Sequence, residues 1–370
     1  MKKSKQKRKM IVAIDSFKGC LTSMEANQAA SDGVRLKMPE AEVVQIPVSD
    51  GGEGWLEAFQ TALGGELVQI LVKDPLMRPV LAPYLVQGDK AVIEMAKASG
   101  LTLLAPEERN PLVASSYGTG QLVADAIRRG CKDIIVGLGG SATSDCGMGM
   151  LRAVIDAFTQ QLSLQEESIN PGTWNEVLVA LHDVKFTIAT DVTNPLCGKQ
   201  GAAEVFAPQK GATPEMIRCL DARARRFAED SARHFGYDCQ NQPGAGAAGG
   251  LGYAFMQYMK AECRSGIELL LDAVHFDEQL KDADLVITGE GSADRQTLMG
   301  KLPYGILQRA RHHNIPVCLL AGRIKDQQLL IDAGFTHVKC INPPELPLEE
   351  AMKPETAKRN ICQCVCSCLQ

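Results

Sequence analysis

Acidic side chains stand at the ends of several short apolar runs in this chain of 370 residues. They are Asp15, Asp50, Glu53, Asp191, Glu290 and Asp294. One or two carboxylates, together with phosphate oxygens and water, are the usual ligands of Mg²⁺. Lysines stand in the same kind of loop, at Lys18, Lys210 and Lys301. A single Asp in a loop is more typical of a turn or a helix cap. Phosphoryl transfer, however, needs mainly positioning and charge neutralisation, so the set as a whole indicates an enzyme that handles phosphate groups.

Two glycine-rich loops add backbone N–H groups suited to an anion. Gly139-Gly140-Ser141-Ala142-Thr143 follows an apolar run and precedes a helical pattern, which is typical of an anion-binding nest with hydroxyl donors. Gly244-Ala-Gly246-Ala-Ala-Gly249 matches the pattern G-x-G-x-x-G. Polar residues precede it, whereas a dinucleotide-binding fold has a strand there. Phosphate or carboxylate binding at a helix start and close Gly/Ala packing are equally good interpretations of this second loop.

Other catalytic and metal-binding patterns are missing from the sequence. It contains no P-loop, H-E-x-x-H pair, EF-hand loop or G-x-S-x-G elbow. The six His residues lie outside the glycine- and acid-rich loops, which argues against a zinc enzyme or a His-based triad. Four of the 13 Cys residues alternate with other residues, at Cys362, Cys364, Cys366 and Cys368. Because zinc sites use pairs spaced C-x₂₋₄-C, we interpret these four as incidental tail residues rather than as a metal site.

Short β-branched apolar runs alternate with helical patterns along most of the chain. The runs occupy residues 10–14, 43–48, 133–138, 186–190, 285–288 and 317–321. The helical patterns occupy residues 23–38, 118–129, 214–235 and 303–313. This alternation predicts an α/β fold with parallel sheets that are covered on both faces. In such sheets, ligands collect outside the carboxyl ends of the strands, where this chain has its Asp, Gly and Lys residues.

Residues 66–95 have a different pattern, because short strands are expected at 67–72, 80–86 and 91–95 without helices between them. We therefore expect a Rossmann-like parallel-sheet domain that is interrupted by an inserted mixed α/β domain, with the active site in the cleft. The first domain would comprise residues 1–75 and 265–370, and the inserted domain residues 76–264.

The composition is that of an ordinary globular protein, with 45% apolar residues and a net charge of −5. The mild acidity argues against binding to duplex DNA, and the 5% aromatic content argues against stacking on single strands. No apolar stretch approaches the ~18 residues of a membrane span, and no signal-peptide core follows the basic residues 1–10. We expect a cytoplasmic protein without nucleic-acid or membrane partners. The oligomeric state is undetermined, and a homo-oligomer stays open.

Many motifs occur together in the order that one known family shows. They are Asp15-Ser-Phe-Lys-Gly19, Asp50-Gly-Gly-Glu-Gly54, Ile93-Glu-Met-Ala-x-Ala-Ser-Gly-Leu101, Tyr117-Gly-Thr-Gly120, Gly139-Gly-Ser-Ala-Thr143, Asp191-Val-x-Asn-Pro-Leu196, Pro208-Gln-Lys-Gly-Ala212, residues 243–252, Ile287-Thr-Gly-Glu-Gly291, Asp294-x-Gln296 and Gly300-Lys-x-Pro303. On these motifs, from residue 11 to about residue 325, the chain resembles the bacterial class I glycerate kinase (glycerate 2-kinase) family. The resemblance implies a two-domain glycerate kinase fold, ATP and Mg²⁺ as cofactors, and phosphorylation of D-glycerate to 2-phosphoglycerate.

The resemblance and the loop chemistry together suggest roles for individual residues. Asp191 or Asp294 would be the base or a metal carboxylate, and Lys18 would neutralise the transferred phosphoryl group; these three are the expected catalytic residues. The residues expected to bind the cofactor are Gly139, Gly140, Ser141, Thr143, Gly244, Gly246, Gly249, Lys210 and Lys301. The residues expected to bind the substrate are Asp15, Ser16, Asp50, Gly51, Gly52 and Asn194, and those expected to bind the metal are Asp191 and Glu290.

Two positions depart from the pattern of the family. Ser144 stands where Asn is expected, and Asp145-Cys-Gly-Met-Gly149 replaces Asp-Gly-Gly-Ala-Gly. Since a serine hydroxyl still donates one hydrogen bond, we expect activity to survive. Three alternatives stay open. They are a glycerate 3-kinase that makes 3-phosphoglycerate, a nicotinamide-dependent hydroxy-acid reductase suggested only by residues 244–249, and a non-catalytic ligand sensor.

Overall fold

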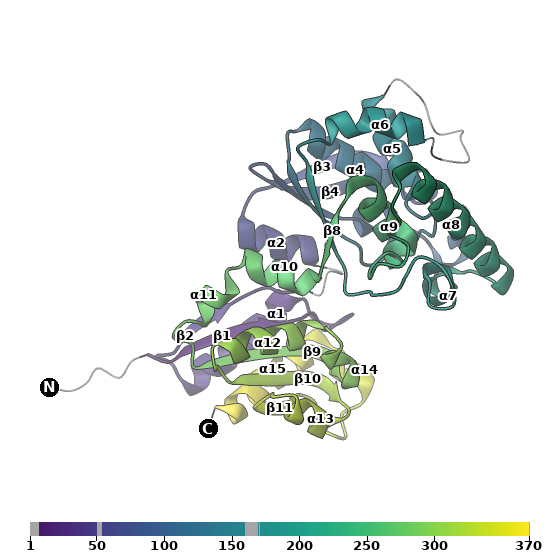
Figure 1. Ribbon diagram of the computed structural model, residues 1–370. Helices are drawn as coiled ribbons and strands as arrows, with labels where there is room; N and C mark the ends of the chain where they lie inside the picture. Colours follow the sequence, from purple (N-terminus) through teal and green to yellow (C-terminus); the bar gives the residue numbers. More distant parts are fainter. Residues whose placement is uncertain (1–6, 50–53, 160–168, 170, 370) are drawn as a thin grey trace. The chain divides into compact units, whose positions relative to one another are not determined.

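The computed structural model describes residues 7–49, 54–159, 169 and 171–369, which form two compact units (Figure 1). The first unit consists of Met1–Asp50, Glu57–Ala62 and Ile267–Gln370. The second consists of Gly51–Leu56 and Leu63–Gly266. None of the helices in the described residues is long and apolar enough to cross a membrane.

The first unit is built on a five-stranded sheet in the order β11-β10-β9-β1-β2, and all of its strand pairs are parallel. The strands are β1 (Lys9–Ile14), β2 (Glu42–Gln45), β9 (Leu285–Ala293), β10 (Val317–Ile324) and β11 (His337–Cys340). The chain passes from β1 to β2 in one direction and from β9 through β10 to β11 in the other. In an open parallel sheet, the reversal point between β1 and β9 is where ligands bind.

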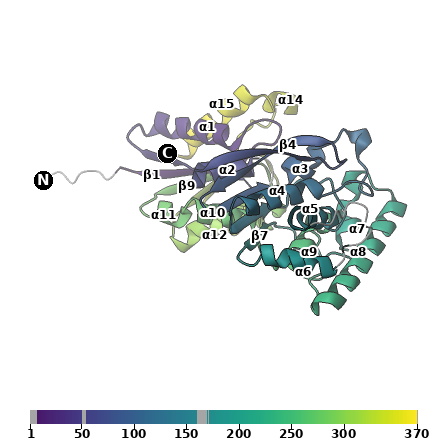
Figure 2. The ribbon, with the colours of Figure 1, turned by 90° about the horizontal axis from the view of Figure 1, so that it is seen from above.

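Helices cover both faces of this sheet. They are α1 (Ser23–Lys37), α10 (Gly266–Ala273), α11 (Phe276–Leu280), α12 (Leu302–His312), α13 (Gln327–Asp332), α14 (Leu348–Ala351) and α15 (Pro354–Cys368), with the middle of α2 (Trp55–Leu63). Figure 2 shows α1 and α15 side by side on one face and α12 on the other. Opposite faces follow from right-handed crossovers that leave β1 and β9 in opposite directions along the sheet. A capping box between Thr22 and Glu25 fixes the start of α1.

The second unit contains a six-stranded mixed sheet in the order β3-β4-β5-β6-β7-β8. Its strands are β3 (Glu66–Lys73), β4 (Pro79–Gln87), β5 (Lys90–Glu94), β6 (Asp133–Gly137), β7 (Lys185–Ala189) and β8 (Glu262–Arg264). The pairs β3–β4 and β4–β5 are antiparallel, and the others are parallel. The three short strands expected between residues 66 and 95 are therefore present. β3 pairs with β4, so residues 66–73 belong to the second sheet, whereas a boundary at residue 75 assigned them to the first domain.

Most helices of the second unit pack against this sheet around a large apolar core, and α7 and the start of α8 share a smaller apolar cluster. They are α3 (Ala96–Ser99), α4 (Tyr117–Arg128), α5 (Met148–Phe158), α6 (Pro171–Ala180), α7 (Ala202–Phe206), α8 (Pro214–Phe235) and α9 (Ala247–Met259). Short 3₁₀ turns cover Leu101–Leu103, Pro106–Glu108 and Pro208–Lys210. Aromatic rings fill the core, where Trp174 lies edge-on to Tyr258 and donates its ring N–H to the Tyr258 carbonyl at 3.1 Å. The core fixes β6 and β7, from which the site loops start.

Candidate active site

A pocket of about 380 Å³ lies at the carboxyl ends of the strands in the first unit. The loop after β1 lines it with Asp15, Ser16, Phe17 and Lys18, and the end of β9 lines it with residues 290–292. β10 contributes residues 322–323, and the segment after β11 contributes residues 341–342. The pocket therefore lies beside the reversal point between β1 and β9. Five residues predicted from sequence line it together: Asp15, Ser16, Lys18, Glu290 and Lys301.

Glu290 is the buried carboxylate of this pocket, with only 7% of the residue exposed. Its Oε1 accepts a hydrogen bond from the Thr297 hydroxyl at 2.6 Å, and its Oε2 accepts one from Lys301 Nζ at 3.1 Å. Burial raises the pKa of Glu290, and the two hydrogen bonds and the Lys301 charge oppose that rise. Lys301 immediately precedes α12, so the start of this helix positions the ammonium group. The pair can accept a proton or neutralise negative charge at the end of β9.

Asp15 is held at the end of β1 by its backbone and its side chain. Its N–H donates to the Gly289 carbonyl at 3.0 Å, which continues the β1–β9 pairing. Its Oδ1 accepts a hydrogen bond from the Ser16 N–H at 2.7 Å, and the residue is 6% exposed. Lys18, three residues on, is exposed at the mouth of the same pocket.

Asp294 lies in the turn after β9 and has a local structural role. Its Oδ1 accepts a hydrogen bond from the Gln296 N–H at 2.8 Å, and its own N–H donates to the Thr297 hydroxyl at 3.0 Å. It caps η4 (Arg295–Leu298), and its charge contributes to the raised pKa of Glu290. Asp294 is not among the residues that line the pocket. Its expected role as a base stays a prediction.

The first glycine loop connects β6 to α5 in the second unit, and it surrounds a buried lysine. Lys210 is 2% exposed, and its Nζ donates to the Ser141 hydroxyl at 2.7 Å and to the Thr143 carbonyl at 2.6 Å. Burial lowers the pKa of Lys210 to about 7, against the opposing charge of Asp145. Gly139 and Gly140 open the loop next to β6. Three residues expected to bind the cofactor, Ser141, Thr143 and Lys210, are thus in direct contact.

Two hydroxyls in this loop have no hydrogen-bond partner within the described residues. They are Thr143 Oγ1 and Ser144 Oγ, and both are buried. A buried polar atom without a partner costs about 1–3 kcal/mol, so native structures rarely keep one without a ligand or water. Asp145 has a different role, because its Oδ2 accepts hydrogen bonds from the N–H and the hydroxyl of Ser116 at 2.8 and 2.9 Å. It fixes the loop to the start of α4.

The second glycine loop packs against the first. The Cys146 N–H donates to the Gly249 carbonyl at 3.0 Å. A Cβ at Gly249 would lie 2.0 Å from the Thr143 carbonyl oxygen. Gly244, Gly246 and Gly249 are all buried, and the Gly246 N–H donates to the Asn194 carbonyl at 2.9 Å. Close backbone packing is therefore a sufficient reason for these glycines, and their expected contact with phosphate stays a prediction.

The start of α9 is less regular than the sequence suggests. Residues 248–250 have left-handed backbone angles inside α9, so regular helix begins after them. Turns rather than a strand precede Gly244, which removes the structural context of a dinucleotide-binding fingerprint. The observation that suggested a nicotinamide-dependent reductase is thus accounted for by packing.

The remaining predicted residues lie elsewhere or outside the described part. Asp191 is exposed just after β7, and its charge acts on the Cys263 thiol. The Asn194 side chain donates to the Gln200 carbonyl at 2.8 Å and closes its own loop. Asp50, Gly51 and Gly52 lie outside the described residues, as does Glu53. Within the described residues, no three His, Cys, Asp or Glu side chains form a group that could hold a metal ion.

Sequence reasoning missed the contribution of the C-terminal segment to the pocket. Asn342 lines it and donates to the Gly322 carbonyl at 2.9 Å, while its Oδ1 accepts a hydrogen bond from Asn360 of α15 at 3.1 Å. Met352 and Ala357 also line the pocket. The only sequence signal for this contribution was the polar Asn342 directly after a strand, because the other predicted site residues also follow strands.

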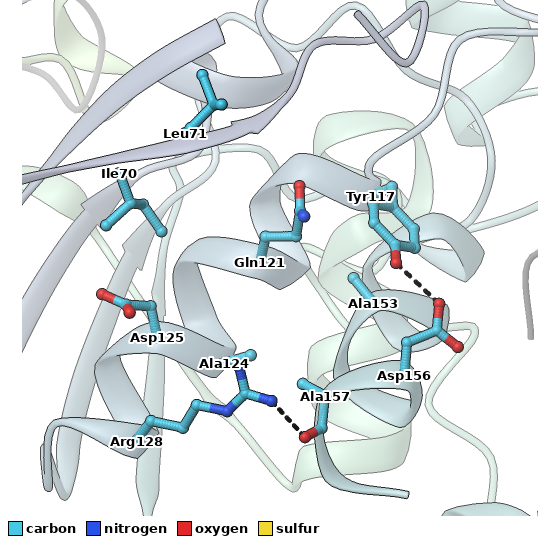
Figure 3. A pocket seen from close by; sticks show the side chains of 10 residues that line it. All are labelled: Ile70, Leu71, Tyr117, Gln121, Ala124, Asp125, Arg128, Ala153, Asp156 and Ala157. Carbon is cyan, nitrogen blue, oxygen red and sulfur yellow. Dashed lines mark hydrogen bonds between the residues drawn. The ribbon is translucent and has the colours of Figure 1, made fainter. Parts of the chain in front are cut away.

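A second pocket, of about 350 Å³, lies between β3, α4 and α5 in the second unit (Figure 3). Two of its polar side chains, Tyr117 and Arg128, donate to other residues that line it. The Tyr117 hydroxyl donates to Asp156 at 2.8 Å, and Arg128 donates to the Ala157 carbonyl. No residue that the sequence predicted for the site is among those that line this pocket.

Comparison with known proteins identifies the family. A model of the glycerate kinase family matches residues 10–369. The chain belongs to the glycerate kinase family. The match continues well past residue 325, where the sequence motifs ended, and it includes the whole of the cysteine-rich α15. The predicted family, the α/β fold class and the enzyme class, a phosphotransferase with an alcohol group as acceptor, are confirmed.

Individual glycerate kinases are similar over nearly their whole length. The glycerate kinase of Haemophilus influenzae is 41% identical over 343 residues, which cover 89% of this chain and 90% of that protein. The glycerate 2-kinase of Escherichia coli is 40% identical over 371 residues, covering 96% and 95%. A crystal structure from Salmonella typhimurium LT2 that carries the name glycerate kinase 2 has a TM-score of 0.82 and 38% identity, and it covers 98% of this chain and 97% of that chain.

Proposed function

We propose that this glycerate kinase transfers the γ-phosphoryl group of ATP to D-glycerate and makes 2-phosphoglycerate. The observation that carries the proposal is the 40% identity, over 95% of its length, to a relative named glycerate 2-kinase. The pocket chemistry agrees, because Lys18 and Lys301 line the same pocket as the buried carboxylates of Asp15 and Glu290, and Lys301 donates to Glu290. Phosphoryl transfer depends mainly on such charge neutralisation and positioning. A cytoplasmic location is part of the same proposal.

We assign different roles to the loops of the two units. In the first unit, Lys18 would neutralise charge on the transferred group, and Asp15 and Ser16 would bind the substrate. In the second unit, Ser141, Thr143 and Lys210 would contact phosphate or carboxylate oxygens, which would give the unpaired Thr143 hydroxyl a partner. Asp191 would take the proton of the glycerate hydroxyl as that oxygen attacks phosphorus. Each of these roles is a proposal for mutation to test.

Mg²⁺ would enter with the nucleotide. The donor set fits an ion held mainly by phosphate oxygens and water with one or two protein carboxylates, since no three-carboxylate cage occurs in the described residues. Glu290 suits this limited role, because each of its oxygens accepts one hydrogen bond and keeps a second lone pair. Asp191 is the other candidate. The ion would neutralise charge on the phosphates.

Product identification tests the proposal. The protein is incubated with ATP, Mg²⁺ and D-glycerate, and enolase is added without phosphoglycerate mutase. Phosphoenolpyruvate should form, since only 2-phosphoglycerate is a substrate for enolase. If it forms only after mutase is added, the product is 3-phosphoglycerate and the 2-kinase assignment is wrong. Lys18→Met should lower kcat by about a hundredfold or more, while Lys281→Met, an exposed lysine outside the pocket, should leave it unchanged.

A further inference from the structure

The pocket of the first unit has a charged side and an apolar side. The charged side chains come from the loop after β1, the ends of β9 and β10, and the residue before α12. They are Asp15, Lys18, Glu290, Lys301 and Arg323. Among the described residues that line the pocket, three cations thus stand against two carboxylates. Because Lys and Arg bind phosphate oxygens through charge-assisted hydrogen bonds, the charged side suits a polyphosphate.

The apolar side is formed mainly by the segment that follows β11. We call the apolar residues of this segment that line the pocket the apolar wall: Ile341, Leu348, Ala351, Met352 and Ala357. Most of them belong to α14 and α15. Figure 2 shows α14 beside α15, on the face of the sheet opposite α12. Phe17, from the loop after β1, also lines the pocket and belongs to the apolar cluster beneath it.

Two large residues of the apolar wall are exposed to solvent. The exposed fraction is 77% for Leu348 and 40% for Met352. The Met352 methyl carbon would lie 3.6 Å from a Cβ at Gly19, so the wall reaches the loop after β1. Exposed apolar surface with a polar rim is typical of a ligand-binding groove. The pocket volume of about 380 Å³ also lies within the range of roughly 300–1,000 Å³ for small-molecule sites.

Asn342 adds a polar group next to the apolar wall. Its side-chain N–H donates to the Gly322 carbonyl, and its Oδ1 accepts a hydrogen bond from Asn360. An Asn side chain has two N–H donors and two acceptor lone pairs, so Asn342 keeps one of each after these two bonds. The edge of an adenine ring has an amino donor and a ring-nitrogen acceptor, and an Asn carboxamide pairs with both. Asn342 therefore suits the recognition of an adenine edge.

We propose that the apolar wall binds the adenine ring of ATP, with Asn342 at the edge of the ring and the phosphates at the charged side of the same pocket. This inference rests on the proposed function, in which ATP is the phosphoryl donor, and it adds the place of the base. The location agrees with open parallel sheets in general, where ligands lie outside the carboxyl ends of the strands at the reversal point. It also puts Glu290 next to the phosphates, where a Mg²⁺ ligand is needed.

Photolabelling of the full-length chain with 2-azido-ATP tests the place of the base. The sample is irradiated with Mg²⁺ present and D-glycerate absent, so the labelling does not depend on the phosphoryl acceptor. Trypsin cleaves after Lys339 and Lys358 but not before Pro354, so the peptide 340–358 contains the whole apolar wall. We expect the label on this peptide, and an excess of ATP should prevent the labelling.

The two ways in which this experiment can fail have different meanings. ATP-protected label on a peptide of the second unit, such as 133–152 with the first glycine loop, would overturn the inference and leave the proposed function intact. The absence of ATP-protected label from every peptide of the folded protein would contradict the use of ATP itself, and this inference with it.

Leu348→Gln tests the contact with the base by kinetics. Loss of apolar contact with the ring should raise the KM for ATP about fivefold or more, while kcat and the KM for D-glycerate stay unchanged. Leu36→Gln is the matched control, because Leu36 is 71% exposed on α1 of the same unit and is not among the residues that line the pocket. An unchanged KM for ATP in Leu348→Gln, or an equal rise in both variants, would overturn the inference.

Discussion

Gly249→Ala tests whether the two glycine loops of the second unit depend on direct backbone contact. Gly249 has a φ of +66°, and a methyl group there would lie 2.0 Å from the Thr143 carbonyl oxygen and 2.7 Å from Ser144 Cα. The left-handed conformation costs a side chain about 1–2 kcal/mol. Overpacking against backbone that cannot move freely adds about 1–3 kcal/mol. We therefore expect the variant to lose roughly 2–5 kcal/mol of unfolding free energy.

Gly236→Ala is the matched control. Gly236 ends α8 in the same unit with a φ of +74°, but a methyl group there would have nothing within 4 Å. It should lose only the conformational cost of about 1–2 kcal/mol. Urea unfolding and scanning calorimetry of both variants measure the difference. Gly249→Ala should also lower kcat, because the Thr143 carbonyl that accepts from Lys210 must move. Equal destabilisation of the two variants would refute the close approach of the loops.

Further predictions concern single ionisable or catalytic groups. Burial lowers the pKa of Lys210 to about 7 in the folded chain. Between that pH and about pH 10, the unfolded chain therefore binds one proton more than the folded chain at this lysine. The unfolding free energy should rise with pH over this range, by up to about 1.4 kcal/mol per pH unit. Lys210→Met should lack this rise when the unfolding free energy is measured by urea unfolding at several pH values. Parallel pH profiles of the variant and the wild type would contradict the prediction. Asp191→Asn should lower kcat by about a hundredfold or more; a folded variant with near-normal turnover removes Asp191 from the chemistry. Thr297→Val removes a hydrogen bond to Glu290 and should raise the pKa of Glu290. The acid limb of the pH profile of kcat/KM should then move to higher pH. An acid limb that does not move would show that Glu290 does not take part in catalysis.

Much of the fold was predictable because buried parallel strands have continuous apolar sequences. The runs at residues 10–14 and 317–321 lie within β1 and β10, and both strands are buried on two faces. The Asp, Gly and Lys residues after these runs lie at strand ends because parallel strands share one carboxyl edge. For the same reason Asp15 and Glu290, 275 positions apart, line one pocket. Patterns that depend on strand ends are visible in a sequence.

Features that depend on packing between distant segments were not predictable. Lysine is among the residues that are rarely fully buried, so nothing marked Lys210 as the buried partner of Ser141. The alternating cysteines of α15 have the spacing of a strand, yet they form a helix whose close contact with α1 depends on Gly33. The glycines at 246 and 249 matched a nucleotide-binding pattern, but they meet the backbone of other loops.

The central claim, phosphorylation of D-glycerate at the 2-hydroxyl, is tested most directly by a ³¹P NMR time course with ATP, Mg²⁺ and D-glycerate. We predict a new phosphomonoester signal that grows in step with ADP, with the coupling to a single carbon-bound proton that a phosphate on the 2-oxygen shows. Coupling to the two methylene protons on carbon 3 would identify 3-phosphoglycerate and contradict the regiochemistry. Intact ATP in the presence of folded protein would contradict the assignment of glycerate as the substrate.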